Sequence, residues 1–115
     1  MVARRDGILA AERCEACTGE TPRVSGRELD ELRGQLSADW EVVDGTRLRR
    51  RLRCPDFGSA FASATRVALI AEGEGHHPDL TVGWGRLVVE LTTHAVRGLT
   101  RNDFILAAKV DAALG

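Results

Sequence analysis

The chain has 115 residues, of which 43% are hydrophobic and 29% are charged, and its formal net charge is -1, as expected for one small globular domain. This balance of charge gives no attraction toward nucleic acid or an anionic membrane, so we expect neither as a partner. No apolar run approaches the ~20 residues that span a bilayer, and three cysteines are too few for a disulfide framework, which together predict a cytoplasmic protein.

The start of the chain is predicted to hold an arm and a short helix. Residues 1–22 show no sustained periodicity, so we expect a poorly ordered arm, followed by a single domain over residues 23–115. Ser25 and Glu28 have the spacing of a capping box, in which each side chain satisfies a free backbone N–H at the start of a helix. An apolar stripe continues this helix to about Ser37.

An arginine-rich hairpin is predicted next. Residues 40–43 and 46–54 have strand character, and Asp44-Gly45 between them is a strong signal for a tight turn. The second strand carries the arginines Arg47, Arg49, Arg50, Arg51 and Arg53. Most of them alternate and predict a solvated face, whereas Arg50 breaks the alternation and indicates a bulge or a subunit contact.

The next helix is predicted to begin after Asp56, whose side chain can cap it, and to end at Gly73 and Gly75. Helical spacing of apolar residues predicts its buried stripe. That stripe consists of Phe57, Phe61, Ala64, Ala68 and Ala71, widened by Val67 and Ile70.

The remaining residues predict two more strands and a last helix. The strands are expected at residues 80–84 and 86–94, and Thr100 is expected to cap the helix that follows. The order is therefore helix, two strands, helix, two strands, helix. This order predicts an α+β fold, with helices packed on one face of a four-stranded antiparallel sheet.

All three histidines of the chain lie in this second half. His76 and His77 are adjacent in a loop, and His94 is expected at the end of a neighbouring strand. A lone histidine is most often an incidental surface or core residue. A loop pair with a third histidine on a predicted neighbouring strand is a candidate site.

A metal site is one interpretation of these histidines. Metal-ligating pairs usually stand two or four residues apart, whereas adjacent residues in an extended segment point to opposite sides. Pro78 favours that extended conformation for His77. Cys14 and Cys17 have the spacing of a zinc or redox motif, but no second pair accompanies them. We therefore expect no metal, and no metal or redox role for the cysteines.

Acid–base chemistry is the better interpretation. Free imidazole has a pKa of about 6.5, so both of its protonation states are available near neutral pH. Neighbouring imidazoles disfavour double protonation, so a cluster can hold one ring as an acid and another as a base at the same pH.

Several fixed positions around the histidines form one pattern. It consists of Glu72-Gly73-Glu74-Gly75-His76-His77-Pro78, then Trp84, Leu91-Thr92-Thr93-His94, Gly98-Leu99-Thr100 and Asp103. This pattern resembles the motif of the pterin-4a-carbinolamine dehydratases, and the resemblance covers roughly residues 14–114. It implies an enzyme that removes water from 4a-hydroxytetrahydropterin, giving quinonoid dihydropterin and recycling the tetrahydropterin cofactor of aromatic amino acid hydroxylases.

The resemblance also implies which residues act. His76, His77 and His94 are the implied catalytic positions, with His77 as general acid and the other two holding the hydroxyl and serving as base. The lone pair of the pterin N5 helps to expel the hydroxyl, so the pterin is the substrate and no metal or other cofactor is needed.

Two carboxylates have a supporting role in this pattern, and each has an alternative interpretation. Glu72 either orients a histidine or is an ordinary charged residue at a helix end. Asp103 stands three residues after Thr100, where a carboxylate closes a capping box, so capping competes with a direct part in the site.

Substrate contacts are implied for three further residues. Trp84 either walls the pocket or is a buried strand aromatic, and Thr92 and Thr93 offer backbone or hydroxyl groups close to His94. Gly75 departs from the family pattern, which often has a polar or acidic residue there.

The resemblance leaves two wider questions open. Family members form homodimers or homotetramers, so we expect a homo-oligomer. Members of this family also act as dimerisation or assembly cofactors for other proteins, which is the alternative to an enzyme. Degenerate members usually lose histidines, and this chain keeps all three, which favours the enzyme.

Overall fold

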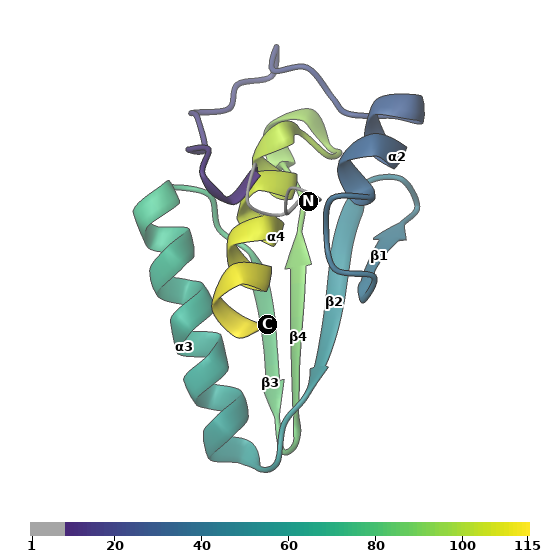
Figure 1. Cartoon of the computed structure of the whole chain (residues 1–115). Helices are drawn as coiled ribbons and strands as arrows, with labels where there is room; N and C mark the ends of the chain where they lie inside the picture. The colour runs from purple at the N-terminus through teal and green to yellow at the C-terminus, as the bar shows by residue number, and fades with distance from the viewer. Residues whose placement is uncertain (1–8) are drawn as a thin grey trace.

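The computed structural model describes residues 9–115 and shows two β-hairpins joined into one sheet (Figure 1). The elements are α2 (Gly26–Arg33), β1 (Trp40–Val43), β2 (Arg47–Arg53), α3 (Phe57–Glu74), β3 (Asp79–Gly83), β4 (Arg86–Leu91), the 3-10 helix η1 (His94–Val96) and α4 (Arg101–Leu114). All neighbouring strands are antiparallel and their order is β1-β2-β4-β3. The predicted α+β class and element order are therefore confirmed.

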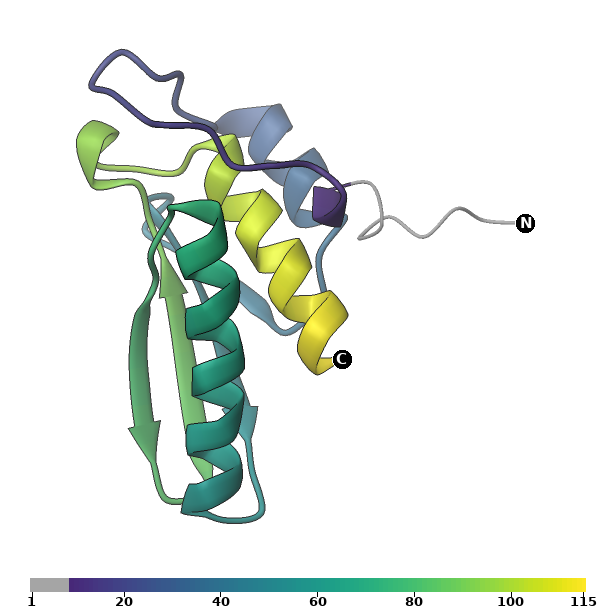
Figure 2. The same ribbon diagram turned by 90° about the vertical axis from the view of Figure 1, so that its left-hand side faces the viewer.

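The core lies between the sheet and the helices α3 and α4, which cover the same face (Figure 2). Leu48, Leu87 and Val89 point into it from the central strands, and Phe104 and Leu106 meet them from α4, all without solvent exposure. Burying such a side chain contributes roughly 1.5–3 kcal/mol. Within residues 9–115, no helix has the length and apolar character needed to cross a bilayer.

Local signals correctly predict the first hairpin turn and both ends of α3. Asp44 and Gly45 both adopt positive φ (54° and 68°), as a type I′ hairpin turn requires. The Asp56 side chain accepts a hydrogen bond from the Ser59 N–H (2.7 Å) at the start of α3. Gly75 ends that helix in the left-handed region with φ 67°.

The buried face of α3 differs from the predicted stripe. Its buried residues are Ala60, Ala64, Val67 and Ala71, whereas Phe57 and Phe61 are 50% and 58% exposed. Three of the buried residues are alanines, whose small side chains allow the helix backbone to lie close to the sheet and α4. The phenyl rings therefore face outward.

Two local predictions at element ends were wrong. Ser25 precedes α2, but its side chain makes no capping hydrogen bond, because Gly26 has a φ of 58° and the first turn is not regular. The last strand ends at Leu91 instead of His94, because a backbone pairing between Thr93 and Gly98 closes a short loop there.

The described part of the expected N-terminal arm, residues 9–22, is packed. Leu9 is fully buried, and the Glu15 N–H donates to the side chain of Asn102 on α4 (3.0 Å). The segment crosses the ends of α3 and α4 (Figure 2). Residues 1–8, the rest of that arm, lie outside the described residues.

Arg50 does not mark a bulge, because the β2–β4 register is continuous from Leu48 to Arg53. Its side chain lies on the core face, where Nη1 donates to Oδ1 of Asp111 on α4 (2.6 Å). Asp111 also accepts the indole N–H of Trp40 (2.8 Å) and the backbone N–H of Ser37 (2.8 Å). This buried ion pair fixes α4 against the first hairpin.

Replacing Asp111 by Ala should lower the free energy of unfolding by about 3–5 kcal/mol, because it removes the only buried carboxylate that pairs with the Arg50 guanidinium among the described residues and leaves the exposed Asp39 at 3.9 Å. Urea unfolding measures this change. Glu41→Ala is the matched control, since Glu41 pairs with Arg49 and Arg51 at the surface (3.5 Å each), and it should cost less than about 1 kcal/mol. Equal losses in the two variants would contradict the account.

Candidate active site

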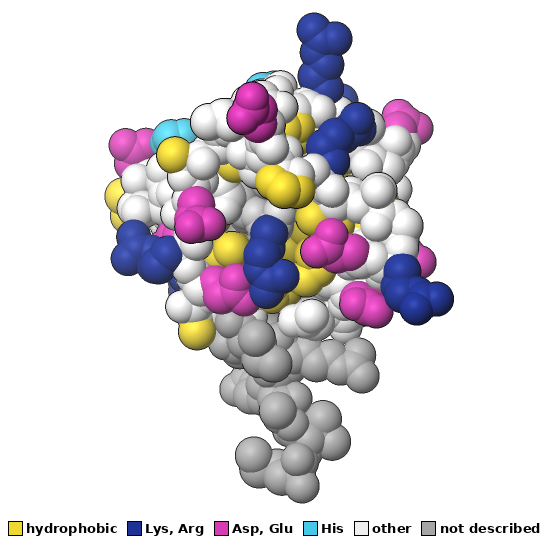
Figure 3. Space-filling model, turned by 90° about the horizontal axis from the view of Figure 1, so that it is seen from above, with side chains coloured by type: hydrophobic (Ala, Val, Ile, Leu, Met, Phe, Trp, Pro, Cys, Tyr) yellow, Lys and Arg dark blue, Asp and Glu magenta, His cyan; other side chains and the backbone are white. Residues whose placement is uncertain are grey.

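The three histidines meet at one end of the sheet, where α3 ends, β4 ends and α4 begins. They line a cleft of ≈ 260 Å³. Its walls are formed by Glu15, Cys17, Gly75, His76, His77, Thr92, Thr93, His94, Ala95 and Asn102. Seen from that end of the molecule, histidine side chains reach the surface (Figure 3).

His76 is held in the cleft wall by a buried carboxylate. Its Nε2 lies 2.6 Å from Oδ1 of Asp103; the imidazole is 11% exposed and the carboxylate is fully buried. A carboxylate at this distance fixes the orientation of the ring and selects which nitrogen carries the proton.

Asp103 makes both a helix-capping contact and a contact with a histidine. Its Oδ1 contacts His76, while its Oδ2 accepts the Thr100 backbone N–H (2.9 Å) at the start of α4. The same oxygen accepts the hydroxyl of Thr93 (2.8 Å), which lies 2.9 Å from the Thr100 hydroxyl. Helix capping and contact with a histidine are therefore not alternatives.

His77 has a different carboxylate partner from His76. Its Nε2 lies 2.7 Å from Oε1 of Glu72, in the last turn of α3. Both side chains are exposed, at 62% and 74%. Glu72 therefore does contact a histidine, and His77 is open to a ligand in the cleft.

His94 opens η1 and is exposed. The loop that carries it is closed at its base, where the Thr93 N–H donates to the Gly98 carbonyl (2.9 Å). Since Thr93 also binds Asp103, this loop and His76 are attached to the same carboxylate. His94 thus lines the same cleft as His76 and His77, from a separate element.

Of the three predicted substrate contacts, Thr92 and Thr93 line the cleft and Trp84 does not. Thr92 lines the cleft, and its hydroxyl donates to the Thr46 carbonyl (2.6 Å). Thr93 is buried, with its hydroxyl committed to Asp103 and Thr100. Trp84 lies in the β3–β4 turn at the opposite end of the sheet and is 74% exposed, so within one protomer it neither walls this cleft nor packs in the core.

Four residues of the wall were not predicted from the sequence: Glu15, Cys17, Ala95 and Asn102. The sequence indicated Cys17 only as one half, with Cys14, of a possible zinc or redox motif. Among residues 9–115, no group of three or more His, Cys, Asp or Glu side chains is arranged to hold a metal ion.

The arrangement offers a clear chemical capability. Two imidazoles each have a carboxylate partner, one buried and one exposed, and a third imidazole lines the same cleft. Such a set can donate a proton at one point of a bound molecule and accept one at another.

Comparisons with known proteins agree with the pattern of residues. The family model of pterin 4 alpha carbinolamine dehydratase matches residues 22–113. Relatives named "Putative pterin-4-alpha-carbinolamine dehydratase" include one from Rickettsia bellii, 42% identical over 90% of this chain and 91% of that protein. Another, from Chlorobium limicola, is 50% identical over 84% of this chain and 87% of its own.

A solved structure is similar as well. The crystal structure of a transcriptional coactivator/pterin dehydratase from Brucella melitensis has a TM-score of 0.75 and 34% sequence identity. The match covers 82% of this chain and 100% of that chain.

Replacing Asp103 by Ala should lower the free energy of unfolding by roughly 2–4 kcal/mol, because it removes a helix cap and leaves buried donors without an acceptor. Urea unfolding measures the loss. Glu72→Ala is the control, because that carboxylate is exposed, and it should change stability by less than about 0.5 kcal/mol. A similar small change at Asp103 would show that its bonds do not support the fold.

Proposed function

Because the chain belongs to the pterin-4a-carbinolamine dehydratase family, we propose that it converts 4a-hydroxytetrahydropterin to quinonoid dihydropterin and water. One observation carries the proposal: three imidazoles from two separate loops line the same cleft, and two of them have carboxylate partners. The proposed physiological role is the recycling of tetrahydropterin.

The reaction requires two proton movements. The bond between C4a and its hydroxyl breaks, and the oxygen leaves as water after receiving a proton. The lone pair of N5 forms the new double bond to C4a, and the proton on N5 is taken up by a base. General acid and general base catalysis each contribute about 10²–10⁴ in rate in such reactions.

We assign the general acid to His77, whose exposed ring can reach a ligand in the cleft while Glu72 orients it (2.7 Å). His76 and His94 hold the hydroxyl and provide the base. Asp103 supports His76 in this role, because its contact keeps the ring in one orientation (2.6 Å). Thr92 supplies a cleft wall beside His94.

The proposed reaction takes no metal and no cofactor, because the electron pair that expels the hydroxyl comes from the pterin itself. Turnover that survives exhaustive dialysis against a chelator supports this. We place the reaction in the cytoplasm, where the three cysteines, which are free thiols in the structure, remain reduced.

We also propose that the protein is a homodimer or homotetramer. The outward face of α3 supports this, since it carries Phe57, Phe61 and Leu69, the last of which is 69% exposed. Exposed apolar side chains on one helix face favour association. Sedimentation equilibrium of the purified protein tests it, and a monomer at all concentrations would contradict it.

The alternative function is a protein-binding cofactor on the same fold. The Brucella melitensis structure is described as both a transcriptional coactivator and a pterin dehydratase. The carboxylate partners of His76 and His77 favour the enzyme here, because a binding surface has no need of oriented imidazoles.

Replacing His77 by Ala should lower kcat for dehydration of 4a-hydroxytetrahydropterin by about 10²-fold or more, because the general acid is lost. Stopped-flow absorbance follows the reaction, and circular dichroism checks that the fold is intact. Arg51→Ala, a change of an exposed side chain on the open face of the sheet, is the control and should leave kcat unchanged. Unaltered turnover in His77→Ala would refute the assignment.

A further inference from the structure

The N-terminal segment forms a wall of the histidine cleft that the catalytic pattern does not include. Glu15 and Cys17 line this cleft, and so does Asn102 from the first turn of α4. Asn102 is the residue next to Asp103 on α4. Asp103 contacts His76, and Asn102 contacts Glu15 of the N-terminal segment.

Asn102 pairs with the backbone of Glu15 in both directions. Its Nδ2 donates to the Glu15 carbonyl (2.6 Å), and its Oδ1 accepts the Glu15 N–H (3.0 Å). The Nδ2 of Asn102 also lies 3.0 Å from the Cys17 sulfur. The backbone carbonyl of Asn102 accepts a hydrogen bond from the Cys14 thiol (3.6 Å). Asn102 is only 7% exposed, so breaking these bonds would leave buried polar groups unsatisfied.

A second anchor holds the segment to the end of α3. The Cys14 N–H donates to the Glu74 carboxylate (2.8 Å), which also pairs with Arg13 (3.1 Å) and Lys109 (3.7 Å). Burial by itself raises the pKa of Glu74, but the Cys14 N–H and the two cations outweigh it and lower that pKa. The Glu74 carboxylate is therefore ionised at neutral pH, where it can bind the Cys14 N–H and pair with Arg13 and Lys109.

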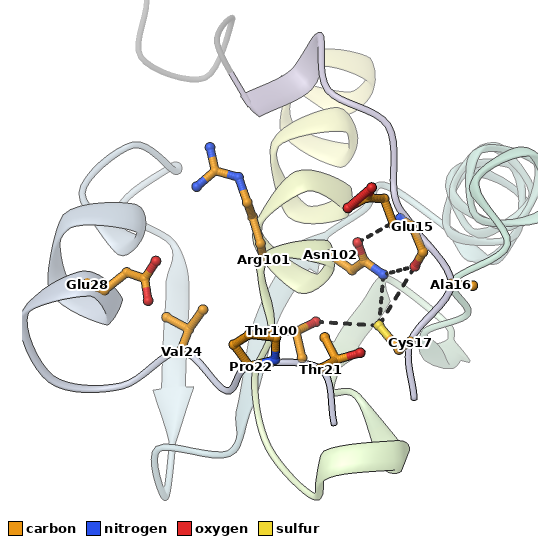
Figure 4. A pocket seen from close by; sticks show the side chains of 10 residues that line it. All are labelled: Glu15, Ala16, Cys17, Thr21, Pro22, Val24, Glu28, Thr100, Arg101 and Asn102. Carbon is orange, nitrogen blue, oxygen red and sulfur yellow. Dashed lines mark hydrogen bonds between the residues drawn. The ribbon is translucent and has the colours of Figure 1, made fainter. Parts of the chain in front are cut away.

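The same residues separate the histidine cleft from a second cleft of ≈ 370 Å³ (Figure 4). Glu15, Cys17 and Asn102 line both clefts. In Figure 4 dashed lines join the Cys17 sulfur to Asn102 and to Thr100, so these contacts link the segment to the start of α4. The segment is thus a partition as well as a wall.

We propose that Asn102 is a positioning residue that sets the substrate fit of the histidine cleft by holding the Glu15–Cys17 partition. The proposal rests on the proposed function, since the ligand is the pterin of that reaction. The partition confines the flat ring to the histidine side and keeps it out of the second cleft. It touches neither the C4a–O bond nor N5, so it contributes to binding and not to proton transfer.

The kinetic test replaces Asn102 by Ala. Because the lost interaction stabilises ground state and transition state alike, KM should rise about tenfold while kcat stays within about twofold. Glu28→Gln is the matched control, because Glu28 lines only the second cleft, and its KM should not change. An unchanged KM in Asn102→Ala, or a fall in kcat alone, would overturn the proposal.

A second measurement uses the unaltered protein and does not depend on turnover. Iodoacetamide labels its thiols with and without tetrahydropterin, and peptide mass spectrometry reads each cysteine separately. Burial raises the pKa of Cys14 to about 12, so that thiol is a poor nucleophile. Cys54, whose N–H donates to Gly85 at the far end of the sheet (2.9 Å), is the internal control.

Tetrahydropterin at ten times its Kd should slow alkylation of Cys17 about tenfold and leave Cys54 unchanged. An unchanged rate at Cys17 would overturn the proposal. A wild-type protein that protects Cys17 but does not dehydrate 4a-hydroxytetrahydropterin would contradict the proposed function alone and leave the partition supported.

Discussion

The buried carboxylate of Asp103 is the interaction on which the site depends. It has no contact with solvent, so its charge is stabilised only by the groups that bind it. These groups are the Thr100 N–H, the Thr93 hydroxyl and the His76 ring. They belong to the start of α4, the loop before His94 and the loop after α3, so the fold cannot form correctly there without also placing His76.

A second buried carboxylate fixes the same helix to the sheet. Asp111 follows Asp103 on α4 by about two turns, and it binds Arg50 and the Trp40 indole from the first hairpin. With a specific partner near each end, α4 is held in both rotation and position along its axis. These contacts therefore also fix the positions of Asn102 and Asp103, the site residues on α4.

Local sequence signals predicted much of this structure, because they depend on neighbouring residues. The Asp44-Gly45 turn and the Asp56 cap are of this kind. The resemblance to a family added the grouping of the histidines with Glu72 and Asp103.

The remaining features depend on partners distant in sequence, which no local pattern reports. Arg50 was interpreted as a bulge or a subunit contact because its partner, Asp111, lies 61 residues away. The Glu15–Cys17 wall depends on Asn102, more than 80 residues further along the chain. The place of Trp84 was missed for a related reason: the register of β3 and β4 puts their turn at the end of the sheet away from the histidines.

We propose that Asp103 supports dehydration through its contact with His76 (2.6 Å). A double-mutant cycle on kcat/KM, with Asp103→Asn and His76→Ala, tests it most directly. If Asp103 acts through His76, Asp103→Asn should lower kcat/KM about tenfold in the wild-type background and less than about twofold once His76 is Ala. The same loss in both backgrounds would show that Asp103 acts independently of His76 and would contradict the account.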